Sequence, residues 1–227
     1  MIFSFNGHLK PSSVSEIPAM PGIQITPEIQ AHIRMLFWVI YSLDKDLCFR
    51  TLRPPMINDD DCDMDISPTP HISLPDSTLN AEMEHTAFYP ADVRLAILKG
   101  KIYRDLYSAK ALRSSDTQLL KVIRELDGDL DVWKSELPVM YRPRRSQNSE
   151  VSIHVTQNAR LLLLHLEYYQ CLNMIHRTST RCLAWDEDTG QKIAAVRSSV
   201  DLCLEASRST IYYLQSSKQL PRAESFW

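Results

Sequence analysis

The stretch that decides the fold runs from Thr26 to Leu47 and reads TPEIQAHIRMLFWVIYSLDKDL. Its first three residues predict a helix start, because the threonine hydroxyl can accept an unpaired amide hydrogen, proline suits the first turn and glutamate suits the positive helix end. Apolar residues then recur every three or four positions, at Ile29, Ile33, Leu36, Ile40, Leu43 and Leu47. This period predicts an amphipathic helix with one apolar stripe, of the kind that normally faces a core. The helix must end before Pro54 and Pro55.

The rest of the chain keeps the helical period, with no strand-like alternation and no internal repeat. A second helix is predicted after Pro90, a third from Ser115 or Asp116 to Leu137, a fourth over about 151–177, and a fifth after Gly190 with Thr189 as a candidate cap. The inward positions predicted for the second helix are Val93, Ile97, Leu98, Ile102 and Leu106. Those predicted for the third helix are Leu119, Ile123, Leu126, Leu130, Trp133 and Leu137. Those predicted for the fifth helix are Ile193, Val196, Val200, Cys203, Ser207, Ile211 and Leu214. The sequence therefore predicts an all-α fold, an irregular multi-helix bundle.

A long acidic, proline-containing loop is predicted between the first two helices, from Arg53 to about Glu82. Its aspartates, at 59, 60, 61, 63 and 65, invite comparison with a calcium loop. The spacing fails, because Met64 falls where such a loop read from Asp59 needs glycine and Pro70 where it needs glutamate. A solvated acidic loop is the interpretation that the pattern favours.

The chain divides into three predicted parts. Residues 1–25 hold prolines, glycines and serines without a sustained period, which is typical of a flexible segment. Residues 26–220 form the helical domain. Residues 221–227 are expected to begin a truncated helix, so that the domain is predicted to be incomplete at its C-terminal side and to expose apolar faces.

Composition narrows the function classes. The 227 residues carry a formal net charge of −3, which argues against a nucleic-acid footprint on this segment. The apolar runs are far too short for a membrane span. Five widely spaced cysteines without any Cys-x-x-Cys pattern indicate reduced thiols, as in the nucleus or cytosol. Enzyme motifs are absent from the sequence, and no catalytic residue and no metal ligand is assigned.

Two other clusters have alternative interpretations. His154, His165 and His176 are each eleven residues apart on the fourth predicted helix, so neighbours are separated by roughly 16 Å and cannot share one metal ion. A row of interface or partly buried imidazoles is favoured. The arginines around Pro143 are either a nuclear-import patch, a phosphate contact or, as favoured, a solvated loop.

Several of these residues fall into a known pattern. Phe37-Trp38, Tyr41, Leu43-Asp44-Lys45, Arg53-Pro54 and the acidic run from Asp59 to Pro68 resemble the signature of the fungal transcription-factor regulatory domain, also called the middle homology domain, of the binuclear zinc-cluster transcription factors. Supporting patterns follow at 126–138 and 163–177, and the resemblance covers about 27–217. The signature residues, interpreted as structural, are Phe37, Trp38, Tyr41, Asp44, Arg53 and Pro54.

Two departures from this pattern bear on the local structure. Lys45 replaces the usual arginine, which keeps the charge and loses the forked donor geometry. Leu52 replaces the usual glycine, which argues against a positive-φ turn before Arg53. Asp44 is predicted to pair with Arg53 where the chain folds back after the helix.

The resemblance implies an all-helical regulatory region of a nuclear transcription factor, and no enzyme. In that family DNA is read by a separate module in which six cysteines hold two zinc ions. This chain has no such cysteine cluster, so zinc and DNA binding are expected only through an absent N-terminal module. Homo- or heterodimers with family members, and contacts with transcriptional co-regulators, are the implied partnerships. The alternative is a stand-alone helical interaction module that pairs with or sequesters transcriptional regulators without binding DNA.

Overall fold

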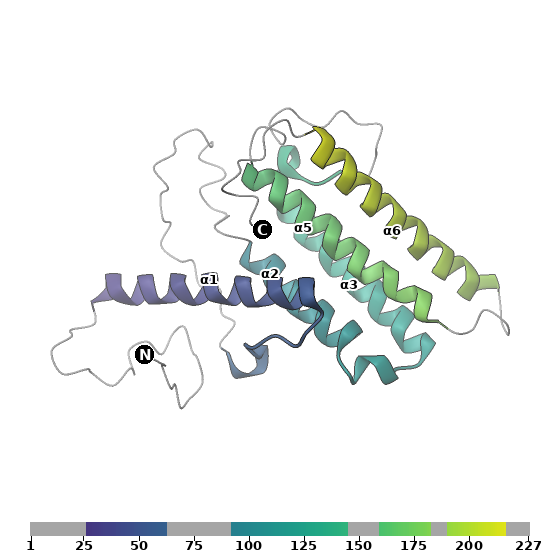
Figure 1. The fold of residues 1–227 in the computed structure, drawn as a ribbon, viewed down its shortest axis with the longest axis horizontal. Coiled ribbons are helices and arrows are strands. Elements are labelled where there is room, and N and C mark those ends of the chain that lie inside the picture. Colours follow the sequence, from purple (N-terminus) through teal and green to yellow (C-terminus); the bar gives the residue numbers. More distant parts are fainter. Residues whose placement is uncertain (1–25, 63–91, 145–158, 183–189, 217–227) are drawn as a thin grey trace. The chain divides into compact units, whose positions relative to one another are not determined.

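A computed structural model describes residues 26–62, 92–144, 159–182 and 190–216 (Figure 1). All regular secondary structure in these ranges is helical, which confirms the predicted all-α class. The α-helices are α1 (Pro27–Thr51), α2 (Val93–Ile102), α3 (Asp116–Glu136), α5 (Ala159–His176) and α6 (Gly190–Ser216). Short helical turns are η2 (Asp59–Asp61), η3 (Tyr103–Tyr107), η4 (Ala111–Arg113), η5 (Val139–Tyr141) and η6 (Arg177–Arg181). The chain forms two compact units, residues 1–100 and 101–227.

In the first unit, α1 begins where the sequence predicts. The hydroxyl of Thr26 accepts a hydrogen bond from the amide of Ile29 at 3.4 Å, and Pro27 occupies the first turn. The helix ends at Thr51, because Leu52 turns into the left-handed conformation and donates its amide to the carbonyl of Cys48 at 2.8 Å. The carboxylate of Asp92 begins α2 in the same way, accepting from the amide of Arg94 at 2.9 Å.

The buried face of α1 is not the apolar stripe. Its side chains with less than a tenth of their surface exposed are Trp38, Tyr41, Ser42, Lys45, Cys48 and Phe49. In the stripe, by contrast, Leu36 and Ile40 are 51% exposed and Leu47 is 56% exposed. The interpretation of the stripe as core-facing is therefore wrong. Both faces of α1 are largely apolar, and the face with aromatic rings and a long lysine stem buries the larger side chains against Ala96 of α2.

In the second unit, α3, α5 and α6 lie side by side (Figure 1). Near the end of α5, His176 contacts Ser199 of α6 and Asp127 of α3. Earlier in α5, His165 lies against Tyr213, and Tyr168 stacks on Trp133 of α3 at 6.2 Å between ring centroids. Both neighbours therefore run antiparallel to α5.

The packing of this unit follows the predicted seams to different degrees. All six seam positions assigned to α3 and its end are buried, and α5 is buried on most sides. On α6, Val196 is buried, whereas Ile211 is 56% and Leu214 is 41% exposed. For these last two residues the inward assignment is wrong, because Ala206, Ser209 and Tyr213 face the other helices instead.

Two histidines of the predicted row are confirmed as buried imidazoles. His176 lies between Ser199 and Asp127, with ring nitrogens 3.3 and 3.1 Å from their oxygen atoms. His165 has its Nε2 2.7 Å from the carbonyl oxygen of Tyr141, so Nε2 carries the hydrogen and donates it. Burial lowers the pKa of His165 to about 4. His154 lies outside the described residues.

Arg142, the first arginine of the basic segment after α3, has a structural role. Arg142 folds back so that its guanidinium donates to the carbonyls of Leu137 and Ser135, at the C-terminal end of α3. Cations are favourable there, because unpaired carbonyls give that end a negative potential. The predicted segments 1–25 and 221–227, the acidic loop beyond Cys62, and Thr189 lie outside the described residues. None of the described helices is long and apolar enough to cross a membrane.

Protonation of His165 should make stability depend on pH. The pKa is about 4 in the folded state and near 6.5 in the unfolded chain, so between these values the unfolded state binds more protons. The free energy of unfolding should therefore fall as the pH drops from about 6.5 towards 4, by up to about 1.4 kcal/mol per pH unit. Denaturant unfolding at pH 7, 6 and 5 should show a smaller loss for His165→Gln than for the wild type. Parallel curves would contradict this assignment.

Candidate functional site

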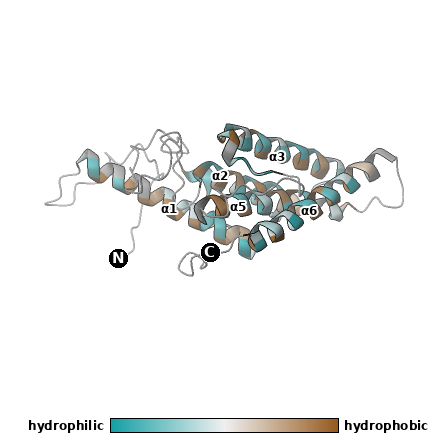
Figure 2. Ribbon diagram, turned by 90° about the horizontal axis from the view of Figure 1, so that it is seen from above, coloured by the Kyte–Doolittle hydropathy of each residue, from teal (hydrophilic) through white to brown (hydrophobic). Residues whose placement is uncertain are grey.

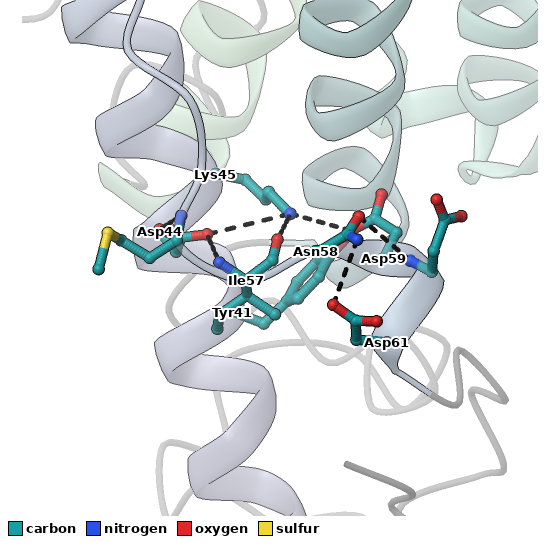
Figure 3. Close-up of polar contacts among 9 residues, drawn as sticks. Tyr41, Asp44, Lys45, Ile57, Asn58, Asp59 and Asp61 are labelled. Carbon is teal, nitrogen blue, oxygen red and sulfur yellow. Dashed lines mark hydrogen bonds and ion pairs between the residues drawn. The ribbon is translucent and has the colours of Figure 1, made fainter. Parts of the chain in front are cut away.

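The polar side chains of the sequence signature meet where the chain returns along α1. We call this the signature cluster and define it as Tyr41, Asp44 and Lys45 of α1 with Ile57 and Asp59 of the segment that follows (Figure 3). All five residues belong to the first unit. Tyr41 and Lys45 are four residues apart, so they lie on one face of the helix.

Lys45 is the centre of the signature cluster. Its side chain is 1% exposed, and its ammonium group donates to the carbonyl of Ile57 at 2.6 Å. The same group lies 2.9 Å from a carboxylate oxygen of Asp59 and 3.9 Å from one of Asp44. It also sits 4.6 Å from the ring centroid of Tyr41. These partners surround a point charge from several directions, a geometry that lysine meets without the planar fork of arginine.

Tyr41 is the second residue of α1 that contacts the carboxylate of Asp59. Its side chain is fully buried, and its hydroxyl donates to a carboxylate oxygen of Asp59 at 2.8 Å. Burial, together with the nearby negative charge of Asp59, raises the pKa of Tyr41 far above its usual value. The phenol therefore stays neutral and acts as a hydrogen-bond donor.

Asp44 holds the returning chain by its backbone. Its two carboxylate oxygens accept hydrogen bonds from the amides of Met56 at 2.8 Å and Ile57 at 3.0 Å. The predicted pairing with Arg53 is wrong, because no ion pair joins these two described residues and Arg53 is exposed. Two convergent backbone amides fix the carboxylate more tightly than one flexible guanidinium would.

The beginning of the acidic run is partly structural. Asn58 caps η2, since its side-chain oxygen accepts from the amide of Asp60 and its side-chain nitrogen donates to Asp61 at 3.2 Å. Asp60 and Asp61 are exposed, as a solvated loop predicts. Asp59 differs, because its carboxylate contacts Tyr41 and Lys45 and is only 19% exposed. The interpretation of the run as merely solvated is therefore wrong for Asp59.

Aromatic rings of α1 pack beside the signature cluster. Trp38 packs edge-to-face against both Phe37 and Tyr41, with ring centroids 5.1 and 5.5 Å apart. Trp38 and Tyr41 form a small core with Ala96, and Phe37, Ile57, Val93 and Ile97 pack around it. Trp38 and Tyr41 are buried and Phe37 is half-buried, which agrees with the structural interpretation of these three signature residues.

Helix α2 approaches the signature cluster at a glycine. A Cβ atom on Gly100 would lie 3.1 Å from a carboxylate oxygen of Asp59 and 3.3 Å from Cε of Lys45. A side chain at this position would crowd Asp59 and Lys45, so glycine suits the close approach. One residue earlier, the ammonium group of the buried Lys99 pairs with Asp46 of α1. Two buried lysines, each with a carboxylate, thus join α1 to the segments that follow it.

Leu52 makes the turn that starts the return. Its φ is 55° and its ψ is 27°, a left-handed conformation that usually belongs to glycine at a helix end. The sequence argument against a positive-φ turn before Arg53 is therefore wrong. The turn forms because the contacts of Asp44 and Lys45 with Met56 and Ile57 fix the chain just beyond it.

The structure brings four signature residues together and leaves two apart. Phe37, Trp38, Tyr41 and Asp44 contribute to this region, whereas Arg53 and Pro54 are exposed. Sequence reasoning missed Asp59 as an acceptor and Lys99 as a buried partner. The available signal was the position of Lys45 on the same helix face as Trp38 and Tyr41, where a buried charge must find carboxylates.

The signature cluster can anchor a segment, and it holds no activated nucleophile. Each of its charged groups contacts another group of the chain, and its phenol is held neutral. The described residues do not fit a binuclear zinc cluster either. All five cysteines are free thiols in separate places, and no group of three or more histidine, cysteine or carboxylate side chains in the described ranges could hold a metal ion.

Comparison with known proteins shows that this chain is similar in sequence to several fungal transcription factors. The chain is 34% identical over 171 residues to an ABC-transporter-regulating transcription factor of Aspergillus oryzae, covering 72% of this chain and 18% of that protein. A protein of the same name from Aspergillus fumigatus is 34% identical over 168 residues, with the same coverage. The fusaridione A cluster transcription factor of Fusarium heterosporum is 26% identical over 197 residues, covering 85% of this chain and 35% of that protein.

All three of these relatives are named as transcription factors. The chain spans less than a fifth of the length of the two Aspergillus relatives. No family model matches the chain. No solved structure matches it significantly.

Replacing Leu52 with glycine should stabilise the protein. The left-handed conformation costs an L-residue roughly 1–2 kcal/mol, and part of the relief is lost to the greater freedom of glycine in the unfolded chain. We expect Leu52→Gly to raise the free energy of unfolding by about 0.5–1 kcal/mol. Leu52→Ala is the matched control, because it shortens the side chain and keeps the strained backbone. Equal stabilities for the glycine and alanine variants, measured by denaturant unfolding, would refute the strain.

Proposed function

We propose that this chain is a regulatory region of a fungal transcription factor. The observation that carries the proposal is the 34% identity with ABC-transporter-regulating transcription factors over 72% of the chain. The signature cluster and the aromatic rings packed beside it add support. They use Phe37, Trp38, Tyr41 and Asp44, four of the residues through which the sequence resembles the regulatory domain of that family, to shape one helix and its return.

DNA binding and zinc binding are assigned to a different part of the full transcription factor. The net charge of −3 and the dispersed cysteines support this division. In the proposed role the protein works in the nucleus, pairs with itself or with related factors, and contacts transcriptional co-regulators. The helical units transmit the effect of these partners to transcription.

A second candidate is a stand-alone helical module that pairs with or sequesters transcriptional regulators without binding DNA. The net charge of −3 and the dispersed cysteines are compatible with this candidate as well. The two proposals predict transcripts whose reading frames begin at different places. A reading frame that continues upstream of Met1 into a cysteine-rich and lysine- and arginine-rich segment supports the regulatory region, and a transcript that starts at Met1 supports the stand-alone module.

A tethering experiment tests the regulatory role. The whole chain is fused to a heterologous DNA-binding domain, and transcription of a reporter with the matching DNA site is measured in a filamentous fungus. We expect the fusion to change reporter transcription relative to the DNA-binding domain alone. Lys45→Met, which leaves the carboxylates of the signature cluster without their cation, should lose the change, whereas Lys121→Met on the exposed side of α3 should keep it.

Immunoblots of the fusions control for their amounts. Reporter transcription equal to that of the DNA-binding domain alone would contradict a regulatory role. Separately, stoichiometric zinc in the purified chain, or a sequence-specific mobility shift with DNA, would contradict the assignment of those activities to another segment.

A further inference from the structure

Two arginines beyond the end of α5 carry positive charge that no carboxylate in the described part of the chain balances. Arg177 and Arg181 are the first and last residues of η6, the short helical turn that follows α5. The ion pairs between described residues involve neither of them. Apolar residues recur along α5 and α6 in the hydropathy colours of Figure 2, as expected of packing helices. Such packing gives no reason for a pair of unbalanced charges beside it.

Tyr107 is the point at which the two arginines meet. The centroid of its ring lies 5.9 Å from Cζ of Arg181. Its hydroxyl donates to the carbonyl of Met174 at 2.6 Å, and the guanidinium of Arg177 lies 3.7 Å from the sulfur of the same methionine. Burial raises the pKa of Tyr107 to about 12, while the positive charges of Arg177 and Arg181 act to lower this pKa. Both guanidinium groups are therefore close to one phenol.

An irregular turn of the backbone carries Tyr107. Residues Tyr103–Tyr107 form the π-helical turn η3, which closes with a hydrogen bond of 3.0 Å from the amide of Ser108 to the carbonyl of Tyr103. Turns of this kind are rare and occur often at functional sites. The combination of a π turn with two unbalanced arginines distinguishes this place from the regular helix packing of the same unit.

The donors of both arginines lack strong acceptors within the described ranges. Nε of Arg181 lies 3.5 Å from the carbonyl oxygen of Thr178, and one of its terminal nitrogens is buried without a hydrogen-bond partner. A buried donor without an acceptor destabilises the structure. Arg177 is exposed, and the acceptor of its guanidinium is the sulfur of Met174, which is a weak one. An oxyanion that contacted both side chains would supply acceptors in the forked geometry that guanidinium groups prefer.

The charge of the site favours a phosphate group over a single carboxylate. A phosphate monoester carries a charge of about −1.5 to −2 at pH 7, which balances two guanidinium groups, whereas one carboxylate balances only one of them. Cys203 of α6 also lies in the field of Arg177. Burial raises the pKa of this thiol, so Cys203 stays neutral and does not compete with an anion.

We propose that Arg177 and Arg181 bind a phosphate group, either free or on a small phosphate ester, beside the ring of Tyr107. This site goes beyond the proposed function, which assigns no small ligand to the chain. Its binding is measured on the purified chain, so its failure and the failure of the tethering experiment are distinguishable. The acidic residues at positions 186–188, which follow η6 in the sequence, are the competing source of negative charge.

Calorimetric titration of the whole chain with inorganic phosphate at low, constant ionic strength tests the site. The wild type should bind one phosphate per chain. Arg177→Gln and Arg181→Gln should each weaken binding by about 10- to 100-fold, the effect of losing hydrogen bonds to a charged group. The matched control is Arg124→Gln, which removes the same charge from an exposed position of α3 and should bind like the wild type. Circular dichroism should show unchanged helix in each variant. If the partly buried Arg181 is needed for folding, the exposed Arg177 carries the test.

Three further titrations identify the occupant. Methyl phosphate binding more tightly than inorganic phosphate would identify an ester as the ligand, and the reverse order would identify free phosphate. Acetate should bind at least about tenfold more weakly than either, because its single charge balances one guanidinium. The triple variant Asp186→Asn, Glu187→Gln, Asp188→Asn should bind phosphate like the wild type.

Four results would overturn the proposal. They are the absence of saturable binding of both phosphate compounds, binding that Arg124→Gln weakens as much as Arg177→Gln does, acetate binding as tight as that of phosphate, and phosphate binding confined to the triple variant. The last result would make the acidic residues of the chain itself the occupant of the site.

Discussion

The buried positive charge of Lys45 is the constraint on which the first unit depends. An ammonium group that is withdrawn from water must be surrounded by acceptors, and here these are the carbonyl of Ile57 and the carboxylates of Asp59 and Asp44. Two of these acceptors belong to the segment after α1, so the charge can be satisfied only when that segment folds back. The strained turn at Leu52 and the close approach of Gly100 are consequences of this return.

This constraint also explains why α1 has two apolar faces. The face with Trp38, Tyr41 and Lys45 is used within the chain, because rings and a long aliphatic stem can be buried while their polar tips find partners. The branched aliphatic side chains of Leu36, Ile40 and Leu47 have no polar tips and remain exposed.

The sequence predicted those features that depend on local patterns. The cap at Thr26, the seam of α3 and the all-helical class follow from hydroxyl chemistry and from a regular period. The sequence could not decide which of two apolar faces of α1 is buried, because periodicity does not record the size and polar tips of the neighbours. It also could not reveal Asp59 as the partner of Tyr41, or the use of backbone amides by Asp44, since both depend on how the chain returns in three dimensions.

Hydrogen exchange at the amides of Met56 and Ile57 tests the central claim most directly. Met56 is 92% exposed, and its amide donates a hydrogen bond to the carboxylate of Asp44, so the loss of that carboxylate should remove the protection of the amide. Both amides should exchange slowly in the wild type and become fast in Asp44→Ala and in Lys45→Met, while the amides of α3 keep their rates. Exchange of these two amides at the rate of an unstructured peptide in the wild type would contradict the account.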